Sequence, residues 1–242
     1  ALYDIYCRPY TEKVWGMDCR SLSADWASQR IQLPSLAAAA TSHLLHPRRR
    51  PSTLVSQFLY PRLGIGMLTD RLADLIRASG YGEISTETSA QAIVWDATDQ
   101  LWAVRCRHGG AEEEARGRHL ISTIPVSALL TALEGAGEEA RQSSRRLGYR
   151  GLVCVFLALA GPQISADTWT YFPDAHLVLG RTHEPPNWSR AMAPAGSTSL
   201  CVEVFCSAGD ERWSSRDEDL TAAVVNDLAR LGILNARRVL QS

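Results

Sequence analysis

The chain has 242 residues, of which 45% are apolar, and its 25 basic residues are balanced by 26 acidic ones. This length and composition can bury one large core or two smaller ones. The balanced charge excludes a general attraction to nucleic acid or to an anionic membrane. The longest apolar run, residues 152–160, is too short to span a bilayer.

The N-terminal half is predicted to alternate helices with short strands. The first thirty residues are rich in tyrosine and tryptophan, and a serine at 21 or 23 can cap a following helix. Residues 34–53 have the composition of a surface loop. Apolar residues at helical spacing predict a helix over 67–79, which Gly80 can end in a left-handed conformation. Strands are expected at 84–95, 101–107 and 117–124, forming a β-meander, and then a helix from Pro125 to Leu133.

The C-terminal half is predicted to form an antiparallel sheet. Strand patterns cover residues 151–160, 168–172, 177–181 and 198–206, and a final helix covers about 216–231. The fold class is therefore α+β, with a mixed and mostly antiparallel sheet packed against helices.

The six cysteines show no CxxC pair and no histidine at the spacing of metal ligands. We expect free thiols in a reducing, cytoplasmic compartment, and no metal site. His43 and His46 in HLLH lack a third ligand nearby in the sequence, which favours surface histidines. Cys201 and Cys206 are an odd number of residues apart on a predicted strand, so their side chains should point to opposite faces.

The stretch YPRLGIGMLTDRLADLIRASG contains two closely spaced glycines before the predicted helix at 67–79. A dinucleotide-binding loop needs a third glycine, where this chain has Thr69, and a buried strand before the loop. QFLYPRL does not have the composition of such a strand. We therefore interpret Gly64 and Gly66 as a tight turn that starts a helix.

Several stretches in sequence order resemble the flavin-dependent amine oxidase superfamily, which includes protoporphyrinogen oxidases, phytoene-desaturase-like enzymes and UDP-galactopyranose mutases. They are YTEKVWGMDCRSLSADWASQRI, the glycine-containing stretch above, HLISTIP and GRTHEPPNWS. The resemblance extends over almost the whole chain. It implies the central part of a flavoenzyme, because the family's N-terminal GxGxxG unit and its C-terminal FAD-binding segment have no counterpart here.

The resemblance also implies different roles for two parts of the chain. Residues 1–60 and 127–242 would form the substrate-binding domain, and residues 61–126 a segment of an incomplete FAD-binding domain. The cofactor would be FAD, bound by the complete parent protein and not by this chain alone. The reaction would be hydride transfer from a C–N or C–C bond to the flavin, and the isolated chain would be inactive.

Site residues follow from the same resemblance. Ala90 occupies the position that contacts adenine through its backbone, and Thr123 and Pro125 lie where the family's strand approaches the cofactor. A small-molecule substrate is expected near Tyr10, Trp15, Trp26, Tyr60 and Arg62. Packing is the alternative role for the aromatic residues, since aromatic side chains are as common in cores as in sites. Arg62 could bind an anionic group or pair with a carboxylate.

Two other functions stay open. A mutase of the UDP-galactopyranose type would need arginines that converge on a diphosphate, and Arg62 and Arg181 are the ones placed to serve. A non-catalytic binding module derived from this fold would need a partner to cover the open edge of the meander. Apolar surface bared where neighbouring segments are missing would favour a homodimer.

Overall fold

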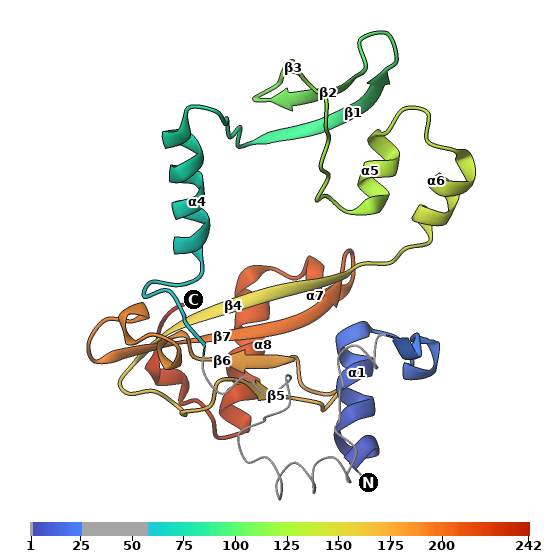
Figure 1. Ribbon diagram of the computed structural model, residues 1–242. Helices are drawn as coiled ribbons and strands as arrows, with labels where there is room; N and C mark the ends of the chain where they lie inside the picture. The colour runs from blue at the N-terminus through green and yellow to red at the C-terminus, as the bar shows by residue number, and fades with distance from the viewer. Residues whose placement is uncertain (1, 26–57) are drawn as a thin grey trace, which may run out of the picture. The chain divides into compact units, whose positions relative to one another are not determined.

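The computed structural model describes residues 2–25 and 58–242 (Figure 1). They belong to two compact units, of which unit 1 covers residues 1–68 and 150–242, and unit 2 covers residues 69–149. Most of the predicted helix after Ser23 lies outside the described residues. Trp26 and the histidines of HLLH lie wholly outside them. Thus the structure divides the chain at 68 and 149, and the assignment of substrate and flavin roles to the two units remains a proposal.

Unit 1 is built on a five-stranded antiparallel sheet with the order β5-β6-β7-β4-β8. The two longest strands, β4 and β7, pair along their whole length, with Arg150 opposite Ser207 and Ala160 opposite Ser197. The strands are β4 (Arg150–Ala160), β5 (Thr170–Tyr171), β6 (Arg181–His183), β7 (Ser197–Ser207) and β8 (Val239–Gln241).

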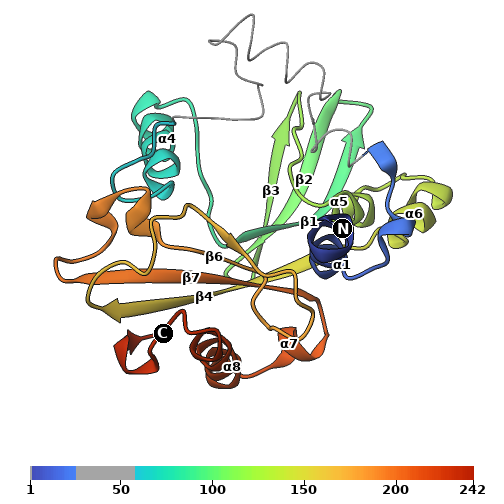
Figure 2. The same ribbon diagram turned by 90° about the horizontal axis from the view of Figure 1, so that it is seen from below.

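One face of this sheet forms the core of unit 1. The alternate residues Leu157 of β4 and Val202 of β7 are fully buried against α8 (Asp217–Arg230), which presents Val224 and Leu228. Figure 2 shows α8 on one side of β4 and β7, seen nearly end-on. Side chains alternate between the faces of a strand, so the neighbouring residues of β4 and β7 point to the opposite face.

The N-terminal segment of unit 1 is helical, which the sequence did not predict. It contains η1 (Tyr3–Cys7), α1 (Arg8–Trp15) and η2 (Cys19–Ser21). A proline in its first turn and a left-handed Gly16 after its last residue define α1. Arg150 donates hydrogen bonds to the carbonyls of Lys13 and Val14 at the end of α1, and to the hydroxyl of Ser207. These bonds attach α1 to the ends of β4 and β7.

Short helices complete unit 1, and one predicted strand is shifted. The sequence predicted a strand at 177–181, but β6 begins at Arg181, because only residues 181–183 pair with β7. Leu177 and Leu179 are buried in the preceding irregular segment. Their alternating apolar pattern therefore results from burial in the core and does not indicate a paired strand. The short helices are η3 (Pro185–Asn187), η4 (Arg190–Met192), α7 (Glu211–Ser214) and η5 (Ala236–Arg238).

Unit 2 contains the predicted meander. It has the order β1-β2-β3 and is antiparallel throughout, with a bulge between Ala90 and Ala92. Its buried apolar side chains are Ile93 and Ala103. The elements are β1 (Thr88–Asp96), β2 (Leu101–His108), β3 (Ala111–Gly117), α5 (Val126–Ala132) and α6 (Glu138–Arg145), preceded by α4 (Gly66–Ser79), which begins in unit 1.

The third strand of the meander differs from its prediction. The reversal after β2 is made by the glycine pair Gly109–Gly110 alone, both with positive φ, so β3 starts at Ala111. A strand was predicted at residues 117–124, but residues 118–124 have an irregular conformation. A strand needs a neighbour to pair its backbone, and none of the described strands pairs with this segment. Ile121 is accordingly 89% exposed.

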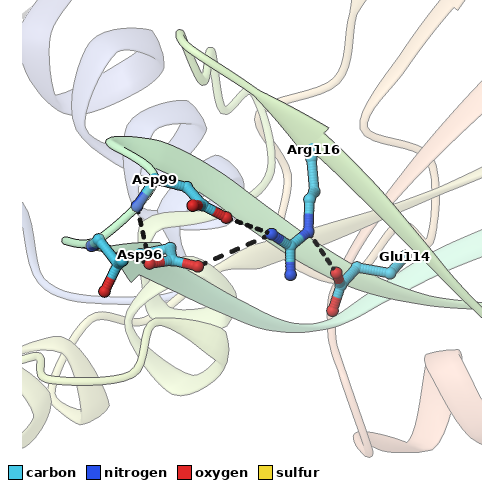
Figure 3. A network of polar contacts seen from close by, with 5 residues as sticks. Asp96, Asp99, Glu114 and Arg116 are labelled. Atoms are coloured by element: carbon cyan, nitrogen blue, oxygen red, sulfur yellow. Dashed lines mark hydrogen bonds and ion pairs between the residues drawn. The ribbon is translucent and has the colours of Figure 1, made fainter.

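An ion-pair network closes one end of the meander (Figure 3). Arg116 of β3 lies 3.7 Å from Asp96, 3.1 Å from Asp99 and 2.7 Å from Glu114. The hydrogen bond and charge of Glu114 raise the pKa of Arg116, with smaller contributions from the two aspartates. All these side chains are well exposed, so the network helps to fix the register of β3 more than it adds stability.

The glycine-containing stretch is a turn, as predicted. The amide of Gly64 donates to the carbonyl of Pro61, its φ is 103°, and α4 starts at Gly66. Within the described part of the chain, no helix combines the length and apolarity that crossing a membrane would require.

Candidate functional site

The candidate site lies in unit 1, on the sheet face opposite α8. Strand register places its central residues: Arg181 of β6 is opposite Glu203 of β7 and also opposite Tyr171 of β5. Directly opposed residues point to the same face of a sheet. These three side chains therefore lie on one face, next to His183, which is opposite Cys201.

Aromatic side chains form a continuous line on this face, which we call the aromatic row. Tyr60 contacts Trp188 with ring centroids 5.2 Å apart, and Trp188 contacts Trp169 at 5.1 Å. The guanidinium of Arg181 lies 5.8 Å from the Trp169 ring and 5.9 Å from the Tyr171 ring, within the range of cation–π attraction. The aromatic row comprises Tyr60, Trp188, Trp169, Tyr171, Tyr10 and Tyr6.

The other end of the aromatic row is formed by α1 and its π-helical extension. Tyr6 and Tyr10 are stacked with centroids 5.6 Å apart, and Tyr171 meets the Tyr10 ring edge-on at 5.3 Å. Tyr10 also packs on Phe205 of β7, where Gly180 leaves the space that a Cβ would fill. Burial raises the pKa of Tyr10 far above neutrality, although the charge of Arg181 opposes this rise. Tyr10 therefore acts as a neutral hydroxyl.

A buried charge pair occupies the centre of the site. Glu203 accepts a hydrogen bond from Arg181 Nε at 2.9 Å and forms an ion pair with the terminal nitrogen of Arg181 at 2.6 Å. Burial alone would raise the pKa of Glu203, but the nearby His183 ring and the hydrogen bond and charge of Arg181 outweigh burial and lower it. Arg181 keeps 32% of its side chain exposed, whereas Glu203 keeps 6%. The guanidinium is thus the part of the pair that a ligand could reach.

The structure brings together some of the residues predicted to bind substrate. Tyr10 and Tyr60 belong to the aromatic row. Trp15 is the last residue of α1, with a buried indole nitrogen. The side chain of Arg62 is exposed, and its carbonyl accepts a hydrogen bond from Ser189. Trp26 lies outside the described residues.

Sequence reasoning missed most of this site. Trp169, Tyr171, His183, Trp188 and Glu203 were not predicted. Glu203 carried a usable signal, because an acidic residue within the apolar strand CVEVFC must find a partner if the strand is buried. The remaining residues are brought together by strand register, which the sequence alone did not reveal.

The residues predicted to contact FAD lie in unit 2. β1 is an edge strand, and on its outer side the described structure shows only a bridge from Ile93 to Leu133. Backbone groups near Ala90 are therefore available to a ligand. Thr123 is exposed in the irregular segment, and Pro125 caps α5. The described residues contain no group of three His, Cys, Asp or Glu side chains able to hold a metal ion.

Comparison with known families identifies the family of this chain. The profile of the family described as "Flavin containing amine oxidoreductase" matches residues 17–242. The chain belongs to this family. The resemblance seen in the sequence and the predicted fold class are thereby confirmed, and the flavin amine oxidoreductase assignment covers both units.

Solved structures show which folds this flavin amine oxidoreductase chain resembles. A reduced UDP-galactopyranose mutase matches 100% of this chain and 51% of its own, with a TM-score of 0.75 and 21% identity. A putative protoporphyrinogen oxidase from Exiguobacterium sp. 255-15 matches 79% of this chain and 39% of its own, with a TM-score of 0.58 and 20% identity. An oxidoreductase from Methanosarcina mazei has a TM-score of 0.53 and 19% identity, covering 74% of this chain and 41% of its own. The chain spans about half or less of the length of these structures.

Proposed function

We propose that this chain supplies the substrate-binding part of an FAD-dependent oxidoreductase of the amine-oxidase type, and that it is inactive alone. The observation that carries the proposal is the aromatic row with Arg181 at its centre. Trp169 and Tyr171 are about 40% exposed beside the guanidinium. Aromatic faces beside a partly exposed guanidinium suit a ligand with a planar apolar part and an anionic group.

The planar apolar part and the anionic group together suggest a substrate class. The ring of an aromatic amino acid could pack on the aromatic row, and its carboxylate could bind Arg181. Its C–N bond is of the kind that amine oxidation breaks. Tyr10 and Tyr60 would contact the ring, and Trp15, Trp26 and Arg62 remain proposed neighbours of the substrate.

The FAD contacts in this chain would be few. The free outer edge of β1 fits a backbone contact from Ala90 to adenine, with Thr123 and Pro125 approaching the cofactor from the segment before α5. When bound, FAD supplies the acceptor for a hydride. The contribution of this chain is to hold the substrate and one side of the adenosine.

A mutase of the UDP-galactopyranose type is the second candidate. The presence of Arg181 in a row of rings favours it, because a uracil base can stack on rings and a diphosphate can bind an arginine. The ion pair between Arg181 and Glu203 weighs against it, since it offsets the charge of Arg181 and a diphosphate carries more negative charge to be balanced than a single carboxylate does. Arg62, the second arginine considered, has an exposed side chain, whereas Arg181 is half-buried.

Ligand binding to the chain tests the proposal. Tryptophan fluorescence would be followed while L-phenylalanine or UDP is added to wild type, to Arg181→Gln and to Arg190→Gln, which changes an exposed arginine. We expect L-phenylalanine to bind wild type and Arg190→Gln, and binding to fall at least about tenfold in Arg181→Gln. Tighter binding of UDP than of L-phenylalanine would favour the mutase. Failure of both ligands to bind would contradict a substrate site on the aromatic row.

A further inference from the structure

Glu203 has two oxygens, and they face different partners. Oε2 accepts the hydrogen bond from Arg181 Nε and also forms the ion pair with its terminal nitrogen, whereas Oε1 lies 3.6 Å from Nδ1 of His183. The histidine side chain is 13% exposed. One buried carboxylate thus lies between a permanent cation and an imidazole, the side-chain type whose charge ordinarily changes between about pH 5 and 8.

His183 is held in place by Trp188. The two rings are stacked with centroids 4.7 Å apart and an angle of 9° between their planes. Nδ1 is buried and, among the described residues, it makes no hydrogen bond within the usual distance. Oε1 of Glu203 is therefore the acceptor available to a proton on Nδ1. Protonation of the ring would shorten this contact to a charge-assisted hydrogen bond.

The other titratable groups around this cluster are Tyr10 of α1, Tyr171 of β5, Cys154 of β4 and Cys201 of β7, together with Asp167 and Glu184, which line the same pocket as His183. Burial raises the pKa of Tyr10, and it raises the pKa of the Cys201 thiol to about 12, with a further contribution from Cys154. Phenols and thiols ordinarily lose their protons above neutral pH. Imidazole is therefore the side-chain type in this cluster that ordinarily changes charge closest to neutral pH.

We propose that His183 is a positioning residue that sets the charge Arg181 presents to an anionic substrate group. With His183 neutral, Arg181 and Glu203 form a pair of zero net charge. With His183 protonated, Glu203 is shared between two cations, the cluster carries a net charge of one, and Arg181 binds an anion more tightly. The inference deepens the proposed function and depends on its assignment of Arg181 to an anionic group.

By linkage, an anion that binds better when His183 is protonated must also raise the pKa of His183. The test uses sulfate, which keeps the same charge across the range in which imidazole titrates. Its affinity would be measured by NMR titration at about pH 5 and pH 8 for wild type, His183→Gln, Arg181→Gln and His176→Gln. His176 is an exposed histidine outside the cluster and provides the matched control.

We expect wild type and His176→Gln to bind sulfate about tenfold more tightly at the lower pH, which corresponds to a rise of one unit in the pKa of His183. His183→Gln should show equal affinity at both pH values, and Arg181→Gln should lose binding at both. The reciprocal measurement needs no variant of the cluster: saturating sulfate should raise the pKa of His183 in wild type, read from its ring proton signals.

Four results would overturn the inference, and they separate it from the proposed function. Sulfate binding that depends on Arg181 but not on pH would overturn the role of His183 and leave the anion site intact. A pH dependence that persists in His183→Gln would do the same. Absence of sulfate binding at both pH values, or binding that survives Arg181→Gln, would overturn both the role of His183 and the anion site.

Discussion

At the scale of single residues, the centre of the site depends on one buried carboxylate. Removing Glu203 leaves the half-buried guanidinium of Arg181 without its partner. Breaking a fully buried ion pair costs about 3–5 kcal/mol. Arg181 keeps about a third of its side chain exposed, so water can replace part of the lost interaction. The loss of stability on removing Glu203 should therefore be smaller than that for a fully buried pair.

We therefore expect Glu203→Ala to lower the free energy of unfolding by about 2 kcal/mol. The double variant Arg181→Met with Glu203→Met should lose less, because it removes both charges and keeps apolar volume on the sheet. Urea titration followed by circular dichroism measures each value. If the double variant is less stable than Glu203→Ala, the ion pair itself stabilises the fold, and the loss in Glu203→Ala is not caused only by leaving Arg181 without a partner.

Lys13, the only lysine of the chain, is the second residue with a distinctive environment. Its ammonium donates hydrogen bonds to the carbonyls of Phe172, Asp174 and Leu179, which attaches α1 to the segment before β6. Burial, followed by repulsion from Arg212, lowers the pKa of Lys13 to about 8. Between this value and the ordinary value of about 10.4, the unfolded chain binds more protons than the folded chain.

Stability should therefore rise with pH across this window. We expect the unfolding free energy of wild type minus that of Lys13→Met to increase by about 1–2 kcal/mol from about pH 7.5 to pH 10.5. The partial exposure of the side chain keeps the increase below the full value for the shift. Taking the difference removes the titration of tyrosines and cysteines, which both proteins share. A difference that stays flat with pH would contradict a lowered pKa.

At the scale of elements, two helices of equal length have opposite environments. Both α4 and α8 have 14 residues and an apolar stripe. In α8, Leu228 is fully buried against the sheet, whereas Leu72 of α4 is 51% exposed. Burial of apolar area, and not helix propensity, supplies most of the stability of a helix in a protein. The same substitution should have different effects in the two helices.

We expect Leu228→Ala to lower the free energy of unfolding of unit 1 by about 3 kcal/mol, because it leaves a cavity in the core. Leu72→Ala should change stability by less than about 0.5 kcal/mol, as is usual for exposed positions. Thermal and urea unfolding of the two variants against wild type provide the measurement. A large loss in Leu72→Ala would show that the apolar face of α4 is covered in solution.

The difference between local sequence patterns and contacts between elements explains which elements the sequence could predict. The long periodic patterns of α4, α8, β4 and β7 are local properties, so those elements were placed to within a few residues. The strands expected at residues 117–124 and 177–181 were largely wrong, because pairing depends on a neighbouring strand and not on the strand's own pattern. Only the register between β5, β6 and β7 brings Tyr171, Arg181 and Glu203 to one face.

At the scale of the whole molecule, the two units bury very different amounts of apolar surface. In unit 2, the buried apolar side chains are Ile93 and Ala103, whereas unit 1 has a core that extends from β4 and β7 to α8. Strands and helices that bury little apolar area open at low free-energy cost. Unit 2 should therefore open before unit 1, and the chain should depart from two-state unfolding.

Hydrogen exchange followed by mass spectrometry can separate the two events. We expect peptides from β1, β2 and β3 to exchange through openings that cost about 2–4 kcal/mol less than those of β4 and β7. Low urea concentrations should accelerate exchange in the meander first, because its opening approaches completion before unit 1 unfolds. Leu228→Ala provides the control, since it should accelerate exchange in β4 and β7 and leave the meander unchanged. Equal protection in both units would contradict this prediction, because it would mean that they unfold as one cooperative body.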